Sequence, residues 1–353
     1  MPKHFLTLII IAFTFTSTLQ SVSSQTTARP AQTSQRSLKL LRSFEAQSAI
    51  TAVDMSRDGK TLATASKGYI QIWDIETGRV LASELPKSSS SQIKEISISP
   101  SEQSFITLIH DSENSYINSY NIKGQLLRQG LGSQIPEFKT EVRYLGGYTI
   151  ATSYRSKDNK NLCNIVHIDL KIGRVIKQST IDAINDWSSS CFEIKRFYDW
   201  ANDTKFLGGL AVQRKLKLDM GFSNLAFSYP KGRLAIVYES RSGIEILDLK
   251  SNKADNSEFN KYLFNPQPTR GMPDFVSTAF SPNGKQLIFG GTDGKVRIWD
   301  FENSSQPITF DAHKSKDDFR DYEAIKFLRF RPDAKTIVSV GGSDRTIKIW
   351  EVK

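Results

Sequence analysis

The chain has 353 residues, of which 39% are hydrophobic and 24% are charged, a composition typical of a folded globular protein rather than a long disordered one. The formal net charge of +10 either favours contact with an anionic surface, such as lipid headgroups or acidic proteins, or gives a generally basic solvated surface. Two cysteines and four histidines offer no zinc-type spacing, so we expect no metal site and no cofactor.

The first 24 residues are typical of a secretory signal peptide. The positive segment Met1–His4 precedes the apolar run Phe5–Leu19, and small residues allow cleavage after Ser24. The run is short for a bilayer span, which needs about 20 apolar residues. We therefore expect an exported protein, periplasmic or secreted, with no transmembrane span after signal removal; a membrane anchor formed by an uncleaved signal is the alternative. Residues 25–36, rich in Thr, Gln and Ser, are predicted to be a flexible leader.

From residue 37 to the end, short apolar or alternating runs recur in pairs around a turn. In most of these turns Pro sets the first dihedral, or Asn, Asp or Gly supplies the tight or left-handed position, so each turn is predicted to close a β-hairpin. Seven such turns occur, at residues 56–60, 99–102, 145–147, 201–204, 229–232, 281–284 and 331–334.

A further alternating strand follows most of these hairpins and ends in an aromatic or aliphatic residue, often with an acid next. The specific copies are Ile70–Asp74, Val296–Asp300 and Thr346–Glu351, and weaker copies are 117–121, 165–169 and 244–248. A strand that closes on Trp-Asp after a hairpin of the Ser-Pro-Asn-Gly kind resembles the WD40 repeat family. The resemblance covers nearly everything from about residue 38 onward. It implies an all-β protein, a β-propeller of four-stranded antiparallel blades.

The number of blades follows from the spacing of the turns. Divided among seven blades, residues 37–353 give about 45 residues for each blade, which is at the upper end of the WD40 period. Asn202 and Lys231 are only 29 residues apart, so we expect the fourth blade, near residues 191–220, to be abbreviated; six blades with an inserted hairpin there is the alternative. The strand at 38–46 resembles 306–312, so it is expected to complete the C-terminal blade and close the ring.

The resemblance also implies a buried polar network. His313, Asp344 and Trp350 match the family positions whose indole, imidazole and carboxylate satisfy one another. A His-Asp pair could also serve catalysis, but no nucleophile stands beside it in the sequence. The corresponding residues in other predicted blades are Asp293, Trp299 and Trp73.

Long connections between blades indicate a binding face. The segments 86–92, 181–190, 265–274 and 314–323 should emerge on one face of a propeller, where insertions usually mark binding; the alternative is unconstrained surface loops. The side chains they carry that are common at interfaces are Trp187, Arg270, Met272, Phe319, Arg320 and Tyr322. Cys163 and Cys191 either form a disulfide in an oxidising compartment or stay as buried thiols.

These features favour a non-enzymatic protein-binding or scaffold module with a protein or peptide partner. One alternative is a propeller hydrolase or lactonase-like enzyme, but the predicted inner strands, rich in Ile, Val, Ala, Phe and Ser, bring no acids or histidines together. Another is a binder of an acidic cell-surface polymer, whose affinity would fall steeply with salt. We expect no nucleic-acid partner, because the basic cluster 214–217 lacks interleaved aromatic residues.

Overall fold

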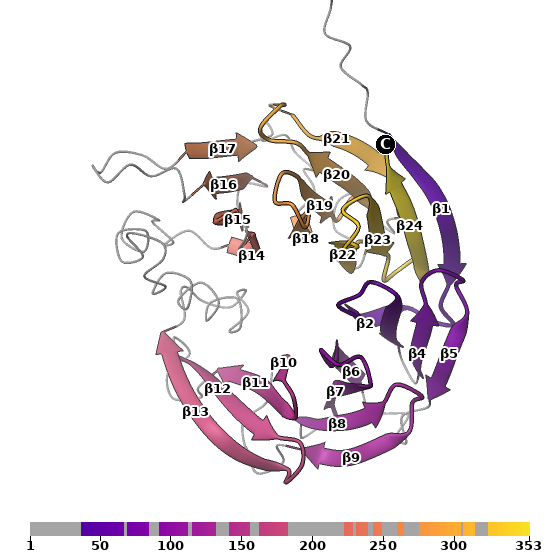
Figure 1. Ribbon diagram of the computed structural model, residues 1–353, viewed down its shortest axis with the longest axis vertical. Helices are drawn as coiled ribbons and strands as arrows, with labels where there is room; N and C mark the ends of the chain where they lie inside the picture. The colour runs from indigo at the N-terminus through magenta and orange to yellow at the C-terminus, as the bar shows by residue number, and fades with distance from the viewer. Residues whose placement is uncertain are drawn as a thin grey trace, which may run out of the picture. The chain divides into compact units, whose positions relative to one another are not determined.

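In the computed structural model the chain is described over residues 37–66, 69–84, 92–111, 115–131, 141–155, 162–182, 222–228, 231–238, 243–248, 260–264, 275–304, 306–314 and 324–353. These residues form 24 β-strands arranged in six four-stranded antiparallel sheets, which are the blades of a β-propeller. Figure 1 shows the first strand of each blade near the centre and the last at the periphery. We number the blades 1–6 in chain order.

The first three blades are each built from four consecutive strands. Blade 1 holds β2 (Ile50–Met55), β3 (Thr61–Ser66), β4 (Tyr69–Asp74) and β5 (Val80–Glu84). Blade 2 holds β6 (Gln92–Ile98), β7 (Ser104–His110), β8 (Ser115–Asn121) and β9 (Leu126–Leu131). Blade 3 holds β10 (Glu141–Gly146), β11 (Thr149–Arg155), β12 (Leu162–Asp169) and β13 (Arg174–Asp182).

The next two blades repeat this order, and the sixth draws on both ends of the described chain. Blade 4 holds β14 (Phe222–Ser228), β15 (Arg233–Tyr238), β16 (Ile244–Asp248) and β17 (Asn260–Phe264). Blade 5 holds β18 (Phe275–Phe280), β19 (Leu287–Gly291), β20 (Lys295–Trp299) and β21 (Ile308–Asp311). Blade 6 holds β22 (Phe327–Phe330), β23 (Thr336–Val340), β24 (Thr346–Val352) and β1 (Leu38–Glu45).

The outer strand of blade 6 comes from the other end of the sequence. β1 pairs antiparallel with β24 from Leu38 opposite Val352 to Glu45 opposite Thr346, with a bulge after Leu40. Two further backbone hydrogen bonds join Ser37 and Lys353, at 2.9 and 3.3 Å. The predicted addition of the N-terminal strand to the C-terminal blade is therefore observed, and it covers an edge of β24 that would otherwise expose unpaired backbone groups.

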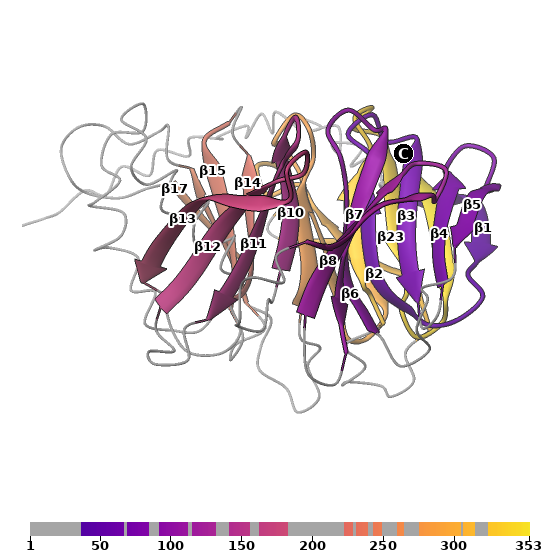
Figure 2. The ribbon, with the colours of Figure 1, turned by 90° about the horizontal axis from the view of Figure 1, so that it is seen from below.

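The hairpin turns form because small polar residues bond their own backbone. In the turn between β2 and β3, Asp58 Oδ1 accepts hydrogen bonds from Ser56 Oγ (2.7 Å) and the Lys60 backbone N (2.9 Å). Gly59 has a φ of 71°, and a Cβ there would lie 2.6 Å from Pro332 Cδ in the neighbouring blade 6. Glycine is therefore required both by the left-handed backbone and by the close approach of blades 1 and 6. Figure 2 shows the blades edge on, with such turns gathered at one end of the strands.

The hydrophobic core lies between neighbouring blades. One cluster joins blade 1 to blade 6, where Trp73 packs with Val338 and Ile347, and similar clusters join blade 1 to 2, 2 to 3, 4 to 5 and 5 to 6. Middle strands such as β7, β19 and β23 are therefore buried on both faces and read as nearly continuous apolar runs, because each face meets a neighbouring blade.

The predicted number of blades needs correction. We expected seven, and the described residues form six. The turn at Lys231 and Gly232 belongs to a full blade, whose four strands span residues 222–264. The abbreviated blade that we placed near residues 191–220 lies outside the described residues. Of the seven turns predicted from the sequence, 201–204 is the one that lies outside the described residues, and the other six each join the first two strands of a described blade.

Candidate functional site

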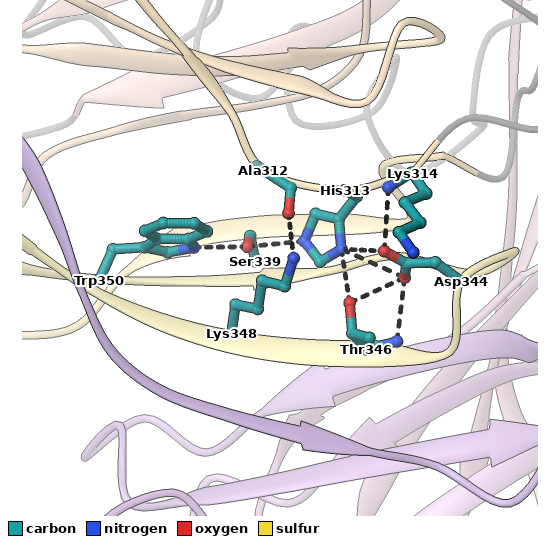
Figure 3. Close-up of polar contacts among 8 residues, drawn as sticks. All are labelled: Ala312, His313, Lys314, Ser339, Asp344, Thr346, Lys348 and Trp350. Carbon is teal, nitrogen blue, oxygen red and sulfur yellow. Dashed lines mark hydrogen bonds and ion pairs between the residues drawn. The ribbon is translucent and has the colours of Figure 1, made fainter.

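A buried chain of hydrogen bonds crosses blade 6 (Figure 3). The Trp350 indole Nε1–H donates to Ser339 Oγ (2.8 Å), and Ser339 Oγ lies 2.8 Å from His313 Nε2. The other ring nitrogen of His313 lies 3.1 Å from Asp344 Oδ2. Strands β23 and β24 supply Ser339 and Trp350, while His313 follows β21 and reaches across from blade 5. The structure therefore brings together the three residues predicted from the sequence and links them through a serine.

The carboxylate of Asp344 is held from several sides. It accepts hydrogen bonds from Thr346 Oγ1 (2.8 Å), the Thr346 backbone N (3.0 Å) and the Lys314 backbone N (3.1 Å). Burial alone would raise the pKa of Asp344, but these bonds and the contact with His313 hold it below its ordinary value. Asp344 is therefore ionised at neutral pH.

The imidazole of His313 is neutral at the same pH. Its side chain is fully buried, and this burial lowers its pKa below the ordinary 6.5 against the opposing effect of Asp344. A neutral ring that donates from Nδ1 to Asp344 accepts at Nε2, where Ser339 can donate while it accepts from Trp350. Each donor in this hydrogen-bonded network thus has an acceptor, and the network links β23 and β24 to the end of blade 5.

Other blades replace parts of this network. In blade 1, Trp73 Nε1 donates to Thr64 Oγ1 (2.8 Å), and Thr64 takes the place of Ser339. In blade 5, Asp293 is bound by Arg297, with one nitrogen–oxygen distance of 2.5 Å, and Trp299 Nε1 donates to the Ser304 carbonyl (2.9 Å). An arginine within the strand therefore does for Asp293 what a histidine from the preceding blade does for Asp344.

The inner strands line a cavity of about 580 Å³. Its walls come from β2, β6, β10 and β22, and they carry two carboxylates and five cationic side chains, a surplus of three positive charges. The cations are Arg57, Lys94, Arg143, Lys326 and Arg329. A volume of this order suits a small ligand or a short peptide segment.

The two acids in the cavity are bound to the backbone of the next blade. Asp54 Oδ2 accepts a hydrogen bond from the Ile98 backbone N (2.9 Å), and Glu95 Oε2 accepts one from the Val142 backbone N (2.7 Å). Both amides lie on inner strands, where the backbone edge faces the centre. These carboxylates therefore also cap the exposed backbone edge of the neighbouring inner strand, and the cavity walls keep a formal surplus of three positive charges.

Two arginines, Arg143 and Arg329, line both cavities found at the inner strands. Arg329 NH1 lies 3.4 Å from Asp54 Oδ1, and its guanidinium carbon lies 5.1 Å from the centre of the Phe327 ring. Arg143 and Arg329 also line a second cavity, of about 510 Å³, whose walls include Phe227 and Phe280. The inner strands are therefore more polar than predicted from the sequence, which read them as rich in Ile, Val, Ala, Phe and Ser and brought no acids or histidines together.

Most of the other residues predicted from the sequence lie outside the part of the chain that the structure describes. The six interface residues Trp187, Arg270, Met272, Phe319, Arg320 and Tyr322 all lie outside the described residues. Cys163 is in β12, whereas Cys191 lies outside the described residues, so their disulfide stays a prediction. Among the residues that the structure describes, no three His, Cys, Asp or Glu side chains are grouped to hold a metal ion, and no helix is long and apolar enough to cross a bilayer.

Sequence reasoning did not identify Ser339, Thr346, the two carboxylate caps or the cavity arginines. Ser339 could have been found as the one hydroxyl within the apolar run Ile337–Val340 of β23, since a buried indole and imidazole need a small polar group between them. The hydrogen bonds that Asp54 and Glu95 accept left no signal in the sequence, because they form only between neighbouring blades.

Comparison with known proteins agrees with this architecture. The family model for the WD domain, G-beta repeat, matches residues 38–74, 270–300 and 306–351. A WD repeat-containing protein of Synechocystis sp. is 27% identical over 122 residues, 35% of this chain. The Arabidopsis thaliana transcriptional corepressor LEUNIG_HOMOLOG is 31% identical over 106 residues, 29% of this chain. The matches span 30% and 12% of the lengths of these two relatives.

Among solved structures, the β-propeller domain of Cps50 (Swd1) from Myceliophteria thermophila superposes with a TM-score of 0.54, covering 90% of this chain and all of that one. Their sequences are 13% identical, so this likeness concerns the fold alone. Together with the repeat matches, it confirms the resemblance on which the predicted fold rested. Three regions of the chain thus match the WD40 repeat, and the described residues fold as the blades of a β-propeller.

Proposed function

We propose that this protein is a non-enzymatic binding module that takes up an acidic segment of a protein partner in the cavity lined by β2, β6, β10 and β22. The observation that carries this proposal is the surplus of three positive charges on the cavity walls, where Asp54 and Glu95 already cap the neighbouring strands. Arginine guanidinium groups bind carboxylates through paired hydrogen bonds, which gives such a site direction as well as attraction.

Several further features support a role in binding. Arg143 and Arg329 also line the adjoining cavity, whose walls are mostly polar, so an acidic partner segment could extend from one cavity into the other. WD40 propellers typically act as protein-interaction scaffolds. The signal-like residues 1–24 support a protein exported to the periplasm or secreted, which would meet this partner outside the cytoplasm.

The test is binding of a fluorescently labelled acidic peptide, rich in Glu and Leu, measured by anisotropy beside a peptide in which every Glu is Gln. We expect the acidic peptide to bind and its affinity to fall with salt, because partly exposed charges are screened. The double variant Lys94→Gln/Arg329→Gln should bind roughly a hundredfold or more weakly, because it loses two charged hydrogen bonds, each worth about 1.5–3 kcal/mol. Lys123→Gln, in an exposed turn of blade 2, should bind normally.

Two results would overturn the proposal. One is equal affinity for the Glu and Gln peptides. The other is unchanged affinity in Lys94→Gln/Arg329→Gln while its thermal unfolding matches that of the unaltered protein. The double variant could unfold at a lower temperature because Arg329 no longer contacts Asp54. In that case the peptide affinity of the single variant Lys94→Gln is the test, because the Lys94 amine contacts the side chain of Gln92 on the same strand.

A further inference from the structure

The turn end of blade 3 exposes an unusual group of large apolar side chains. Leu145 and Tyr148, at the β10–β11 turn, are 51% and 59% exposed, and Ile172 in the β12–β13 turn is 60% exposed. Val175 and Ile176, at the start of β13, are 37% and 52% exposed. The Leu170 backbone N donates to the Tyr148 carbonyl (2.7 Å), so the two turns lie side by side. We call these five residues the blade 3 patch.

Blade 1 provides an internal comparison for the β12–β13 turn. Its turn Asp74–Gly78 has the same layout as Asp169–Gly173, with an acid first and a left-handed glycine last (φ 71° and 74°). In both turns the carboxylate accepts a hydrogen bond from the backbone N of the fourth residue. That residue is Thr77 in blade 1, where its hydroxyl also bonds Asp74, and Ile172 in blade 3. The turn therefore does not require an apolar residue at this position.

A bulge explains why two consecutive residues of β13 are exposed. Val175 lies opposite Ile168 and Lys177 opposite His167, so Ile176 is the extra residue on the outer strand. Three other outer strands have an apolar pair at the same register, each with its second residue unpaired: Leu40–Leu41, Val80–Leu81 and Leu126–Leu127. These pairs are 38–58% exposed. Among the residues that the structure describes, only those of blade 3 add exposed apolar side chains on both neighbouring turns to the outer-strand pair.

Cationic side chains surround the blade 3 patch. Lys171, Arg174 and Lys177 are exposed beside it, and the Lys171 ammonium lies 4.1 Å from the centre of the Tyr148 ring. The nearby acid, Asp169, is bound to the backbone N of Lys171 (2.7 Å) and to that of Ile172. Apolar side chains on turn tips, flanked by cations, match the boundary of an anionic bilayer, where apolar groups enter the headgroup region and cations meet lipid phosphates.

We propose that the blade 3 patch docks the protein on an anionic lipid surface. Charge complementarity favours this occupant over a second copy of the chain, which would set the same three cations against one another. The surface is separate from the inner-strand cavity, so a membrane-bound protein would keep the cavity free for a partner. The inference does not depend on the peptide-binding proposal.

The test uses the full protein, as the cell processes it, with vesicles of phosphatidylglycerol and phosphatidylcholine or of phosphatidylcholine alone. A Tyr148→Trp variant should be quenched by brominated lipid chains in the anionic vesicles, and a Lys123→Trp variant in blade 2 should show no quenching beyond that of the natural tryptophans. We expect Ile172→Thr/Ile176→Thr, whose first change copies the turn of blade 1, to bind the anionic vesicles roughly tenfold or more weakly, because two apolar side chains no longer leave water. Leu81→Thr, at the equivalent bulge of blade 1, is the matched control and should bind normally.

Equal quenching at positions 148 and 123, or equal vesicle affinity of Ile172→Thr/Ile176→Thr and the unaltered protein, would overturn the proposal. Binding to neutral vesicles as strong as to anionic ones would overturn it too. Retention of peptide binding by the patch variant, and of vesicle binding by Lys94→Gln/Arg329→Gln, would keep the two proposals independent, so that either can fail alone.

Discussion

Replacing Ser339 by alanine is expected to destabilise the protein more than any other loss of a single hydroxyl in the described network. Ser339 is fully buried and is the partner of both the Trp350 indole and the second nitrogen of His313. Ser339→Ala leaves two buried polar groups without that partner, and each such group costs about 1–3 kcal/mol, so we expect a loss of about 2–6 kcal/mol in the free energy of unfolding.

Blade 1 provides the control for this prediction. Thr64 bonds the Trp73 indole in the same way, and its own hydroxyl donates to the Gln71 carbonyl (3.5 Å), whereas that of Ser339 contacts a histidine ring. Thr64→Val keeps the size of the side chain and leaves one indole unsatisfied, so the expected loss is about 1–3 kcal/mol. Urea unfolding followed by tryptophan fluorescence measures both values, provided that the slope with denaturant is unchanged. Equal losses in the two variants, or a loss below about 1 kcal/mol for Ser339→Ala, would refute this account of the network.

Three further predictions concern the same blade. Since burial lowers the pKa of His313 below its ordinary 6.5, the unfolded state takes up the proton first, and stability should fall as the pH drops below about 6.5; His313→Gln should flatten that part of the pH profile of melting temperature. Gly341→Ala should cost about 1–3 kcal/mol, because its Cβ would lie 2.2 Å from Asp344 Oδ1 and 2.5 Å from the His313 ring; urea unfolding measures the loss. Deleting residues 37–45 removes β1 and should lower the melting temperature by many degrees or prevent folding, as followed by circular dichroism.

Each of these has its own control. The pH profile of His313→Gln is compared with that of His110→Gln in blade 2, which should keep the decline near pH 6.5. Gly130→Ala has open space for its Cβ but a left-handed backbone (φ 68°), so it measures the cost of backbone strain alone, whereas Gly341→Ala measures the cost of the steric clash. Deleting the predicted leader, residues 25–36, should leave melting unchanged; equal effects of the two deletions would contradict the role given to β1.

The blade repeat could be predicted because its strands and turns are determined by local chemistry. The turn at 56–60 and the strand ending in Trp73 each contain, within a few residues, the groups that shape them. The addition of β1 to blade 6 could also be predicted, because strand 38–46 resembles the outer strand it replaces. The number of blades was not predicted correctly, because the spacing of turns alone does not show whether a short interval, such as the 29 residues from Asn202 to Lys231, holds a full blade.

The site was less predictable because its contacts join different blades. Asp54 looks like an ordinary exposed acid on a half-buried strand, and its bond to the backbone of Ile98 exists only once two blades are side by side. Arg297 could replace the missing histidine because it lies on the same strand as Trp299, two residues earlier, which repeat alignment alone does not reveal. The exposed pairs on the outer strands were hidden by bulges, since strict alternation would bury one residue of each.

Hydrogen–deuterium exchange of the full protein, with and without the acidic peptide, tests the central claim most directly. If the inner-strand cavity is the binding site, the peptide slows exchange at the inner strands β2, β6, β10 and β22 and leaves the outer strands β5, β9 and β13 unchanged. Protection confined to the outer strands, or none at saturating peptide, would show that the basic cavity is not where this propeller binds its partner.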